Sequence, residues 1–250
     1  MHDPKRTPGN SPPPFVPRVV PAGDSALMLE LAAELDLEAN AMAHRIADEV
    51  RAARLDGVTD VIAAIVTVTV YFRAESAAQA AARRAVIIDF LMAALARPRS
   101  GADAVEREPL EIPVCYEPAF APDLVEVAER TGLSTDDVVA RHTATLHRVL
   151  MIGFAPGFPY LGGLDPRLAA VPRRPTPRAR VEAGSVAIAN GQSVIYPFAT
   201  PGGWNLIGRT PMRLFDPLRQ PPALVAAGDR VKFVPITARD YERRARGGAR

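Results

Sequence analysis

The first half of the chain carries two kinds of hydrophobic pattern. Residues 26–31 (ALMLEL) alternate apolar and polar side chains, which predicts a strand. Residues 39–55 and 76–96 repeat apolar side chains every three or four positions, which predicts two helices. Residues 58–63 and 65–72 are rich in β-branched side chains and predict a pair of strands between those helices.

This succession of strand, helix, two strands and helix is typical of a small ferredoxin-like α+β domain. A further strand near residues 110–114 would complete its sheet. We therefore place an α/β domain at residues 18–108. Residues 1–17 hold six of the 25 prolines and few apolar side chains, so they predict a disordered tail.

The pattern changes after residue 109. Residues 111–116 predict a strand, residues 122–131 a short helix, and residues 135–146 a second helix. Ser134 and the acidic side chain three positions later form a capping-box pattern at the start of that second helix.

Short apolar runs separated by Pro/Gly turns fill the rest of the chain. Their length and spacing between residues 148 and 236 are typical of an antiparallel barrel or sandwich. We place this second domain at residues 109–238 and interpret residues 239–250 as a short basic tail.

Composition narrows the class of protein. Of 250 residues, 48% are hydrophobic and 23% are charged, as in soluble globular proteins. No window approaches about 18 uninterrupted apolar residues, so we expect no membrane partner. A net charge of +2 argues against nucleic-acid binding, and the single cysteine, Cys115, excludes an internal disulfide. The first residues lack the apolar core of a secretion signal, which predicts a cytoplasmic protein.

Residues 153–164 form a loop of glycines and prolines with three aromatic side chains. Such a loop is rigid at Pro156 and permits close approach at Gly157. It would turn backbone N–H groups toward an anion or carbonyl while Phe158 and Tyr160 wall a pocket. The alternative is a set of tight hairpin turns with aromatic plugs.

Four arginines and three prolines lie together at residues 172–180. A stiff arginine loop favours a phosphate or carboxylate partner, with Arg173 and Arg178 as the cations, although a solvated basic loop is the alternative. Gly184 and Ser185 form a turn that would expose a hydroxyl, but no nucleophile-elbow motif surrounds them.

A third motif follows at Tyr196 and includes Gly202, Gly203 and Trp204, the single tryptophan. A lone tryptophan after two glycines is most typical of a core plug. Arg209 then places a fixed positive charge at the end of a predicted strand.

The chain has four histidines without metal-binding spacing, so we predict no metal site. His142 is the one candidate general base. No Ser-His-Asp or Cys-His set can be assembled, so a hydrolytic site on this chain would be incomplete.

The ordered motifs strongly resemble those of the family of B-type subunits of 5-oxoprolinase, also described as allophanate hydrolase subunit 1 or Kip-type histidine-kinase inhibitors. The resemblance covers about residues 18–236. It rests on six segments, which are residues 23–27, 152–164, 172–178, 183–186, 195–204 and 208–210.

This resemblance implies a cyclophilin-like β-barrel after the α/β domain. It implies a subunit that opens 5-oxoproline to L-glutamate with ATP, and with Mg²⁺, together with a larger cyclophilin-like subunit and a lactam-handling subunit. Biotin attachment to this chain is not expected. Two alternatives are a carboxyltransferase-like module of the allophanate/urea pathway and a non-catalytic inhibitor that binds a histidine kinase.

The resemblance also suggests roles for the candidate residues. Amide activation by phosphorylation needs cations and backbone donors around the developing negative charge. The cations would be Arg173, Arg178 and Arg209, and His142, which matches a family histidine, would carry a proton. The remaining candidates would bind substrate or ATP, and they are Pro156, Gly157, Phe158, Tyr160, Gly184, Ser185, Tyr196, Gly202, Gly203 and Trp204.

Overall fold

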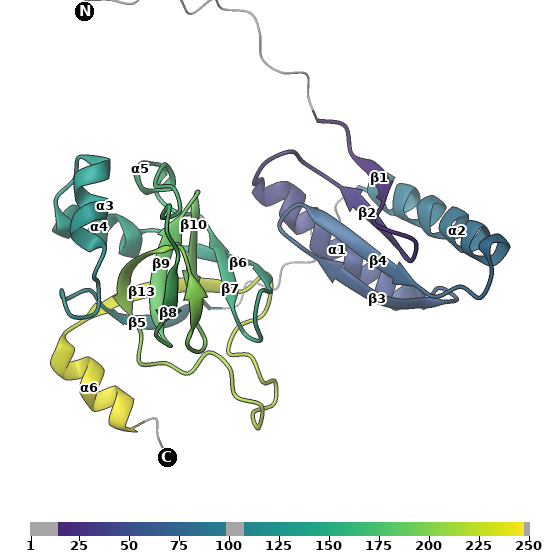
Figure 1. Ribbon diagram of the computed structural model, residues 1–250. Helices are drawn as coiled ribbons and strands as arrows, with labels where there is room; N and C mark the ends of the chain where they lie inside the picture. The colour runs from purple at the N-terminus through teal and green to yellow at the C-terminus, as the bar shows by residue number, and fades with distance from the viewer. Residues whose placement is uncertain (1–14, 99–107, 248–250) are drawn as a thin grey trace, which may run out of the picture. The chain divides into compact units, whose positions relative to one another are not determined.

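The computed structural model describes residues 15–98 and 108–247. The chain divides into two compact units, Met1–Arg97 and Pro98–Arg250 (Figure 1). Most of the predicted N-terminal tail lies outside the described residues, as do the last three positions of the predicted basic tail.

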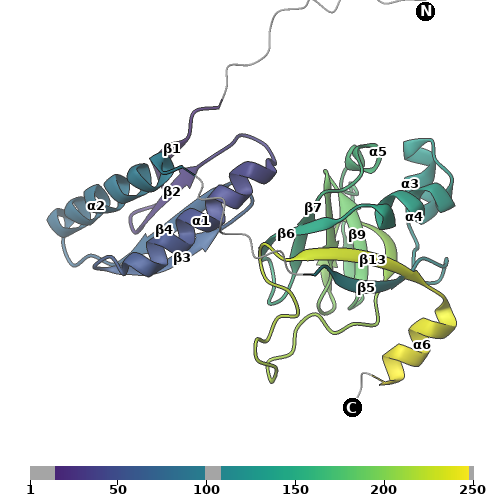
Figure 2. The same cartoon turned by 180° about the vertical axis from the view of Figure 1, so that it is seen from behind.

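The N-terminal unit is a four-stranded sheet covered on one face by two helices (Figures 1 and 2). The strand order is β1-β2-β4-β3, and every neighbouring pair is antiparallel. Leu29, Ile46, Val70 and Leu91 belong to the core between sheet and helices. The elements are β1 (Arg18–Pro21), β2 (Ala26–Glu30), α1 (Leu37–Ala53), β3 (Val58–Ala63), β4 (Thr67–Phe72) and α2 (Ala77–Ala96).

Side-chain caps explain where these two helices begin. Asp36 accepts a hydrogen bond from the amide of Ala39 at 2.7 Å, so α1 begins two residues before the predicted position. Ser76 accepts one from the amide of Gln79 at 3.2 Å and precedes α2.

The fourth strand of this sheet is not the predicted one. The edge position beside β2 is filled by β1, in which Val19 pairs with Leu29. The strand predicted near residues 110–114 is β5 (Leu110–Cys115), which pairs instead within the C-terminal unit. The strand predicted at residues 111–116, after the change of pattern, is this same β5, so the apolar run indicates a strand but does not decide which sheet it joins.

The C-terminal unit is a closed seven-stranded barrel in the order β10-β7-β6-β13-β5-β12-β9. A separate two-stranded sheet pairs β11 with β8. Beside β5, the strands of this unit are β6 (His147–Ile152), β7 (Pro159–Gly162), β8 (Arg178–Val181), β9 (Ser185–Ala189), β10 (Gln192–Ile195), β11 (Thr200–Gly202), β12 (Asn205–Arg209) and β13 (Arg230–Ile236).

The predicted antiparallel pairing holds at every junction of the described barrel strands except one. Strands β5 and β13 run parallel, with Phe233 opposite Ile112, and Figure 2 shows them side by side. They are the first and last strands of the barrel in the chain, so a long connection separates them, as parallel pairing requires.

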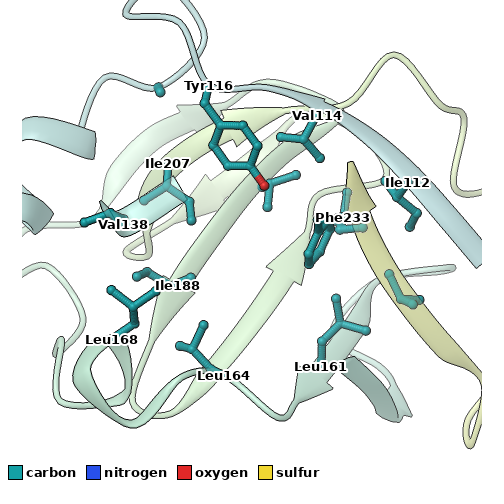
Figure 3. Packing of buried hydrophobic residues seen from close by; sticks show 14 of the residues in the cluster. Ile112, Val114, Tyr116, Val138, Leu161, Leu164, Leu168, Ile188, Ile207 and Phe233 are labelled. Atoms are coloured by element: carbon teal, nitrogen blue, oxygen red, sulfur yellow. The ribbon is translucent and has the colours of Figure 1, made fainter. Parts of the chain in front are cut away.

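Side chains along the barrel strands alternate between the interior and the outer face. Leu161, Ser193 and Ile188 lie in register on neighbouring strands, and Leu161 and Ile188 belong to the interior core. Figure 3 shows Tyr116 and Phe233 projecting into this interior. The opposite face of the same strands carries a second, smaller apolar cluster.

Four helices accompany the barrel, and they are α3 (Leu124–Thr131), α4 (Thr135–Ala144), α5 (Pro166–Ala169) and α6 (Ala238–Gly247). The predicted capping box is confirmed, because Ser134 and Asp137 bond reciprocally at the start of α4. Residues 238–247 form a helix where the sequence analysis predicts a basic tail. Within the described ranges no helix combines the length and apolar character that crossing a bilayer demands.

We predict that Val19→Ala lowers the free energy of unfolding of the N-terminal unit by about 1 kcal/mol, because Val19 packs against its core. Val20 follows Val19 and faces the other side of the strand, so Val20→Ala is the matched control with a smaller loss. Urea unfolding followed by circular dichroism measures both. Equal losses would contradict an anchoring role for Val19.

Candidate functional site

An aromatic cluster lies on the outer face of the barrel. Tyr160, Val194 and Ala187 are in register on β7, β10 and β9, and all three belong to or pack on the outer apolar cluster. The ring of Phe158 contacts Tyr160 at 5.2 Å and Tyr196 at 5.1 Å between centroids. The structure therefore brings together aromatic side chains that are up to 38 positions apart in the chain.

Trp204 closes this aromatic cluster, at 6.1 Å from Tyr160 between ring centroids. It is buried, as predicted for a core plug. Gly202 lies against the hydroxyl of Tyr196, and a Cβ there would overlap that hydroxyl. The glycine is therefore needed for the close approach of the chain to the Tyr196 hydroxyl.

Burial raises the pKa of Tyr196 to about 12, with a further rise from Tyr160, while Arg173 acts in the opposite direction. Burial also raises the pKa of Tyr160, again against Arg173. Both phenols are therefore protonated at neutral pH, and a backbone hydrogen bond from Trp204 to the Tyr196 hydroxyl opposes the rise in the pKa of Tyr196.

Loop 172–178 lies against the cluster. The guanidinium of Arg173 lies over the Trp204 ring, 5.1 Å from its centroid. The amide of Arg174 donates to the carbonyl of Gly203 at 2.7 Å. The predicted arginine loop and the predicted Gly-Gly-Trp motif thus form one surface.

Asp123 is not among the residues predicted from the sequence, and it holds the arginines of this surface in place. Its carboxylate is 3% exposed, and Oδ1 accepts hydrogen bonds from Arg178 at 2.6 Å and from Arg174 at 3.0 Å. Oδ2 accepts one from the amide of Leu206 at 2.7 Å. A buried carboxylate between two guanidinium groups holds both arginines in place.

Arg178 keeps one donor unused. Its Nη1 is shielded from solvent and has no hydrogen-bond partner among the described residues, whereas Nη2 bonds Asp123. Arg174 is more fully committed, because it also bonds Glu126 at 2.7 Å. That bond, with a second from Arg130, lowers the pKa of Glu126. Both arginines therefore keep nitrogens without a hydrogen-bond partner among the described residues, and their side chains are similarly exposed, at 26% for Arg174 and 28% for Arg178.

Gly184, Ser185 and Arg209 form a second local group. Arg209 donates from Nε to the carbonyl of Ala183 at 2.8 Å, and a Cβ at Gly184 would overlap the Thr210 carbonyl. Ser185 is buried, which favours a structural role over that of a nucleophile. The amide of Gly184 donates to the Tyr196 carbonyl at 2.7 Å, so this group lies behind the aromatic cluster.

The loop that contains Pro156 and Gly157 packs on the segment after β12. Gly157 has a φ of +73°, and a Cβ there would lie 2.7 Å from Cβ of Phe215. Phe154 has a φ of 64° although it is not glycine, and its ring is 68% exposed. Its ring packs edge-to-face with the ring of Phe158, with 5.2 Å between the centroids. A strained and exposed aromatic side chain beside the cluster is a further candidate contact residue.

His142 does not join these residues, because it lies inside the barrel. Its Nδ1 bonds the Tyr116 hydroxyl and its Nε2 bonds Ser193, each at 2.8 Å. Its ring stacks on Phe233 at 4.4 Å, and none of its surface is exposed. Full burial with both nitrogens engaged favours a structural role over the predicted proton transfer.

Two cavities lie elsewhere in the C-terminal unit. One of about 680 Å³ is lined by α3, α4, the segment that follows β5 and the end of β13. The other, of about 470 Å³, lies between α6 and the segment after β12. None of the predicted site residues lines either cavity. No set of three or more His, Cys, Asp or Glu side chains in residues 15–98 and 108–247 is placed to hold a metal ion.

Comparisons with known proteins identify the family to which this fold and these motifs belong. Residues 17–225 match the family described as carboxyltransferase domain, subdomain C and D. The chain therefore belongs to a carboxyltransferase-type class of domains. The chain is also 41% identical over 229 residues to the B-type subunit of 5-oxoprolinase from Bacillus subtilis (strain 168), covering 88% of this chain and 92% of that protein. The chain belongs to the family of B-type subunits of 5-oxoprolinase.

Solved structures extend this comparison. The crystal structure of TTHA0988 is 34% identical with a TM-score of 0.70, and the match covers 85% of this chain but 40% of that one. The urea amidolyase of K. lactis is 21% identical with a TM-score of 0.75, over 94% of this chain and 16% of the other. This second likeness shows a shared fold alone.

We predict that the barrel loses stability as the pH falls below about 6.5. Burial lowers the pKa of His142 well below its ordinary value, with a contribution from His147, and burial also lowers the pKa of His147. The unfolded chain therefore binds protons that the folded barrel does not, which costs up to about 1.4 kcal/mol per histidine and pH unit.

Urea unfolding between about pH 5 and about pH 7.5 measures this dependence. His142→Gln removes one of the two titrating groups and should flatten it. His44→Gln, in the N-terminal unit, is the control that should leave it unchanged. An unaltered slope in His142→Gln would contradict the assignment.

We also predict that Asp123→Asn lowers the free energy of unfolding by about 2–4 kcal/mol, because it leaves the Arg174 and Arg178 charges without their buried partner. Glu126→Gln removes a partly exposed carboxylate that also binds Arg174, and it should cost at most about 1 kcal/mol. Thermal unfolding of both variants measures the difference. Similar losses would contradict a special role for the buried carboxylate.

Proposed function

We propose that this chain is the B-type subunit of an ATP-dependent 5-oxoprolinase that opens 5-oxoproline to L-glutamate. The observation that carries the proposal is 41% identity across 92% of a protein that is named as the B-type subunit of 5-oxoprolinase. The candidate surface supports it, because a substrate with a carboxylate, and a phosphate-bearing co-substrate, both need cationic partners.

The proposed partners are a larger cyclophilin-like subunit and a lactam-handling subunit. Two observations support an assembly of several parts. The relative from B. subtilis is itself named a subunit. The chain of TTHA0988 continues well beyond the matched region, which is 40% of its length, so there this fold is joined to other parts in one polypeptide.

The residues of the outer surface fit an anionic ligand. Arg173 makes a contact with Trp204 but no ion pair with the described residues, and the side chain of Arg178 is 28% exposed beside the buried Asp123. These two cations would hold the phosphate groups of ATP or the carboxylate of the substrate. Trp204 and Tyr160 would wall the same site. Arg209, whose Nε is engaged with the carbonyl of residue 183, would contribute its charge from behind.

Ring opening breaks the amide C–N bond of the lactam after water adds to its carbonyl carbon. ATP, when bound, would supply the phosphoryl group that activates this carbonyl, with ADP as the first leaving group; a second water would release the phosphoryl group as inorganic phosphate, and the freed nitrogen would take up a proton. The role of this chain would be electrostatic, since fixed donors and cations stabilise the negative charge that develops on oxygen. Tyr196 is 1% exposed, so it would form a wall behind the site rather than contact that oxygen.

A second candidate is a carboxyltransferase-like role in the allophanate/urea pathway. Two findings favour it, namely the family description as a carboxyltransferase domain and the fold shared with the K. lactis urea amidolyase. The same surface would then hold a carboxylated nitrogen compound. The two candidates differ in the substrate that stimulates ATP use.

To test the proposal, the tagged chain is purified from its host with the proteins that accompany it. We expect ATP-dependent release of glutamate from 5-oxoproline. Arg178→Ala should lower kcat/KM by about 100-fold, because a cation that meets developing charge is lost. Arg180→Ala is the matched control on the same strand, because Arg180 is exposed and pairs with Glu182, and it should change the rate less than about twofold.

The outcomes separate the candidates. ATP hydrolysis that urea stimulates and 5-oxoproline does not would favour the second candidate and contradict the first. Full activity in Arg178→Ala would contradict the role given to this residue, while leaving the activity of the complex established.

A further inference from the structure

The cavity of about 470 Å³ beside α6 lies apart from the outer-face cluster. One wall comes from α6, which lies beyond residues 17–225 that match the family. The other wall is the segment 211–224, and the floor is Glu111 and Pro113 of β5. Neither the family match nor the proposed function gives this cavity a role.

Both walls of the cavity are held in place. Helix α6 is anchored at its start, where the amide of Ala238 donates to Glu117 at 2.8 Å and Tyr241 contacts Phe120 at 4.5 Å between ring centroids. In the other wall, Arg219 donates four hydrogen bonds to backbone carbonyls of residues 213, 214, 221 and 222. Because both walls are already ordered, little conformational entropy is lost when a ligand enters the cavity.

The charges of the cavity lining are unbalanced. Three arginines, Arg213, Arg219 and Arg244, line it together with one carboxylate, Glu111. The hydrogen bonds of Arg219 go to neutral carbonyls and leave its charge uncompensated. Arg213 forms an ion pair with Asp216 at 3.2 Å, which is exposed on the arginine side and therefore weak. The lining as a whole favours an anion.

Arg244 is the cation of the lining with the most freedom to meet a ligand. It has no hydrogen-bond or ion-pair partner among the described residues, whereas the adjacent Arg243 pairs with Asp240 at 2.6 Å. The two neighbouring arginines of α6 therefore differ in commitment, and only Arg244 lines the cavity.

Apolar side chains fill the rest of the lining, chiefly Met212, Leu224 and Pro211. The lining thus combines cationic with apolar side chains, which matches a molecule with a charged end and an apolar body. The volume lies within the range of about 300–1,000 Å³ that is usual for small-molecule sites.

We propose that this cavity binds a small organic anion, whose carboxylate or phosphate group contacts Arg244 and Arg213 and whose apolar part lies against Met212 and Leu224. The inference does not rest on the proposed function. Arg244 is the residue that best reports on it, because its side chain is exposed and its replacement leaves the barrel core unchanged.

Isothermal titration of the full chain tests the proposal with four separate probes, which are ATP, inorganic phosphate, L-glutamate and 5-oxoproline. Each titration is repeated in Arg178→Ala, so that binding at the outer-face cluster is separated from binding at this cavity. We expect saturable binding of at least one probe that Arg178→Ala does not change. The phosphate and carboxylate probes then identify which anionic group the cavity takes.

Three variants locate the binding. Arg244→Ala should weaken it about tenfold through loss of a charge-assisted contact. Arg243→Ala, the neighbouring arginine on the same helix, should change it less than about twofold. Glu111→Gln should strengthen binding, because it removes the one carboxylate of the lining. Absence of saturable binding for all four probes, or equal weakening by Arg243→Ala and Arg244→Ala, would overturn the proposal.

Discussion

The buried carboxylate of Asp123 is the interaction on which the candidate surface depends. A charge removed from water must be compensated by partners of good geometry, and here it has two guanidinium groups and one backbone amide. These partners come from the arginine loop, from β8 and from β12, while Asp123 itself precedes α3. One side chain therefore connects four segments and sets where Arg178 lies. The aromatic cluster provides the apolar surface of the site, whereas the Asp123 carboxylate determines where the arginines lie.

The elements that the sequence predicts best are those determined by local chemistry. The bounds of β3 agree with its β-branched run, and the capping box at Ser134 is visible in the sequence as a serine with an acidic side chain three positions later. The pairing of strands that are far apart in the chain leaves no comparable signal in the local sequence. The sequence predicts a strand near residues 110–116 but leaves open which of the two domains it joins, and the structure places it in the barrel. The helical form of residues 238–247 is not predicted, because this sequence is almost entirely polar.

The candidate site shows the same division. Tyr160, Arg173, Tyr196 and Trp204 were selected as separate motifs, and the fold gathers them on one face of the barrel. Asp123 could not be found, since 55 positions separate it from Arg178 and nothing near it in the chain indicates an arginine partner. His142 is the opposite case, a residue that the sequence suggests and the fold does not support. A histidine with a structural role in a core and a histidine that transfers protons give the same local sequence signal. Burial, which is known from the fold alone, separates the two roles.

The parallel pairing of β5 with β13 has a consequence for how the protein is made. During translation the N-terminal unit is complete once residue 96 has emerged, and its contacts are all available from that point. The barrel differs, because its first strand waits for its last, about 120 residues later in synthesis. Until residue 236 leaves the ribosome, one edge of β5 has no partner and its apolar side chains are open to other chains. A nascent chain that stalls before this strand is thus the form of the protein most exposed to aggregation and to capture by chaperones.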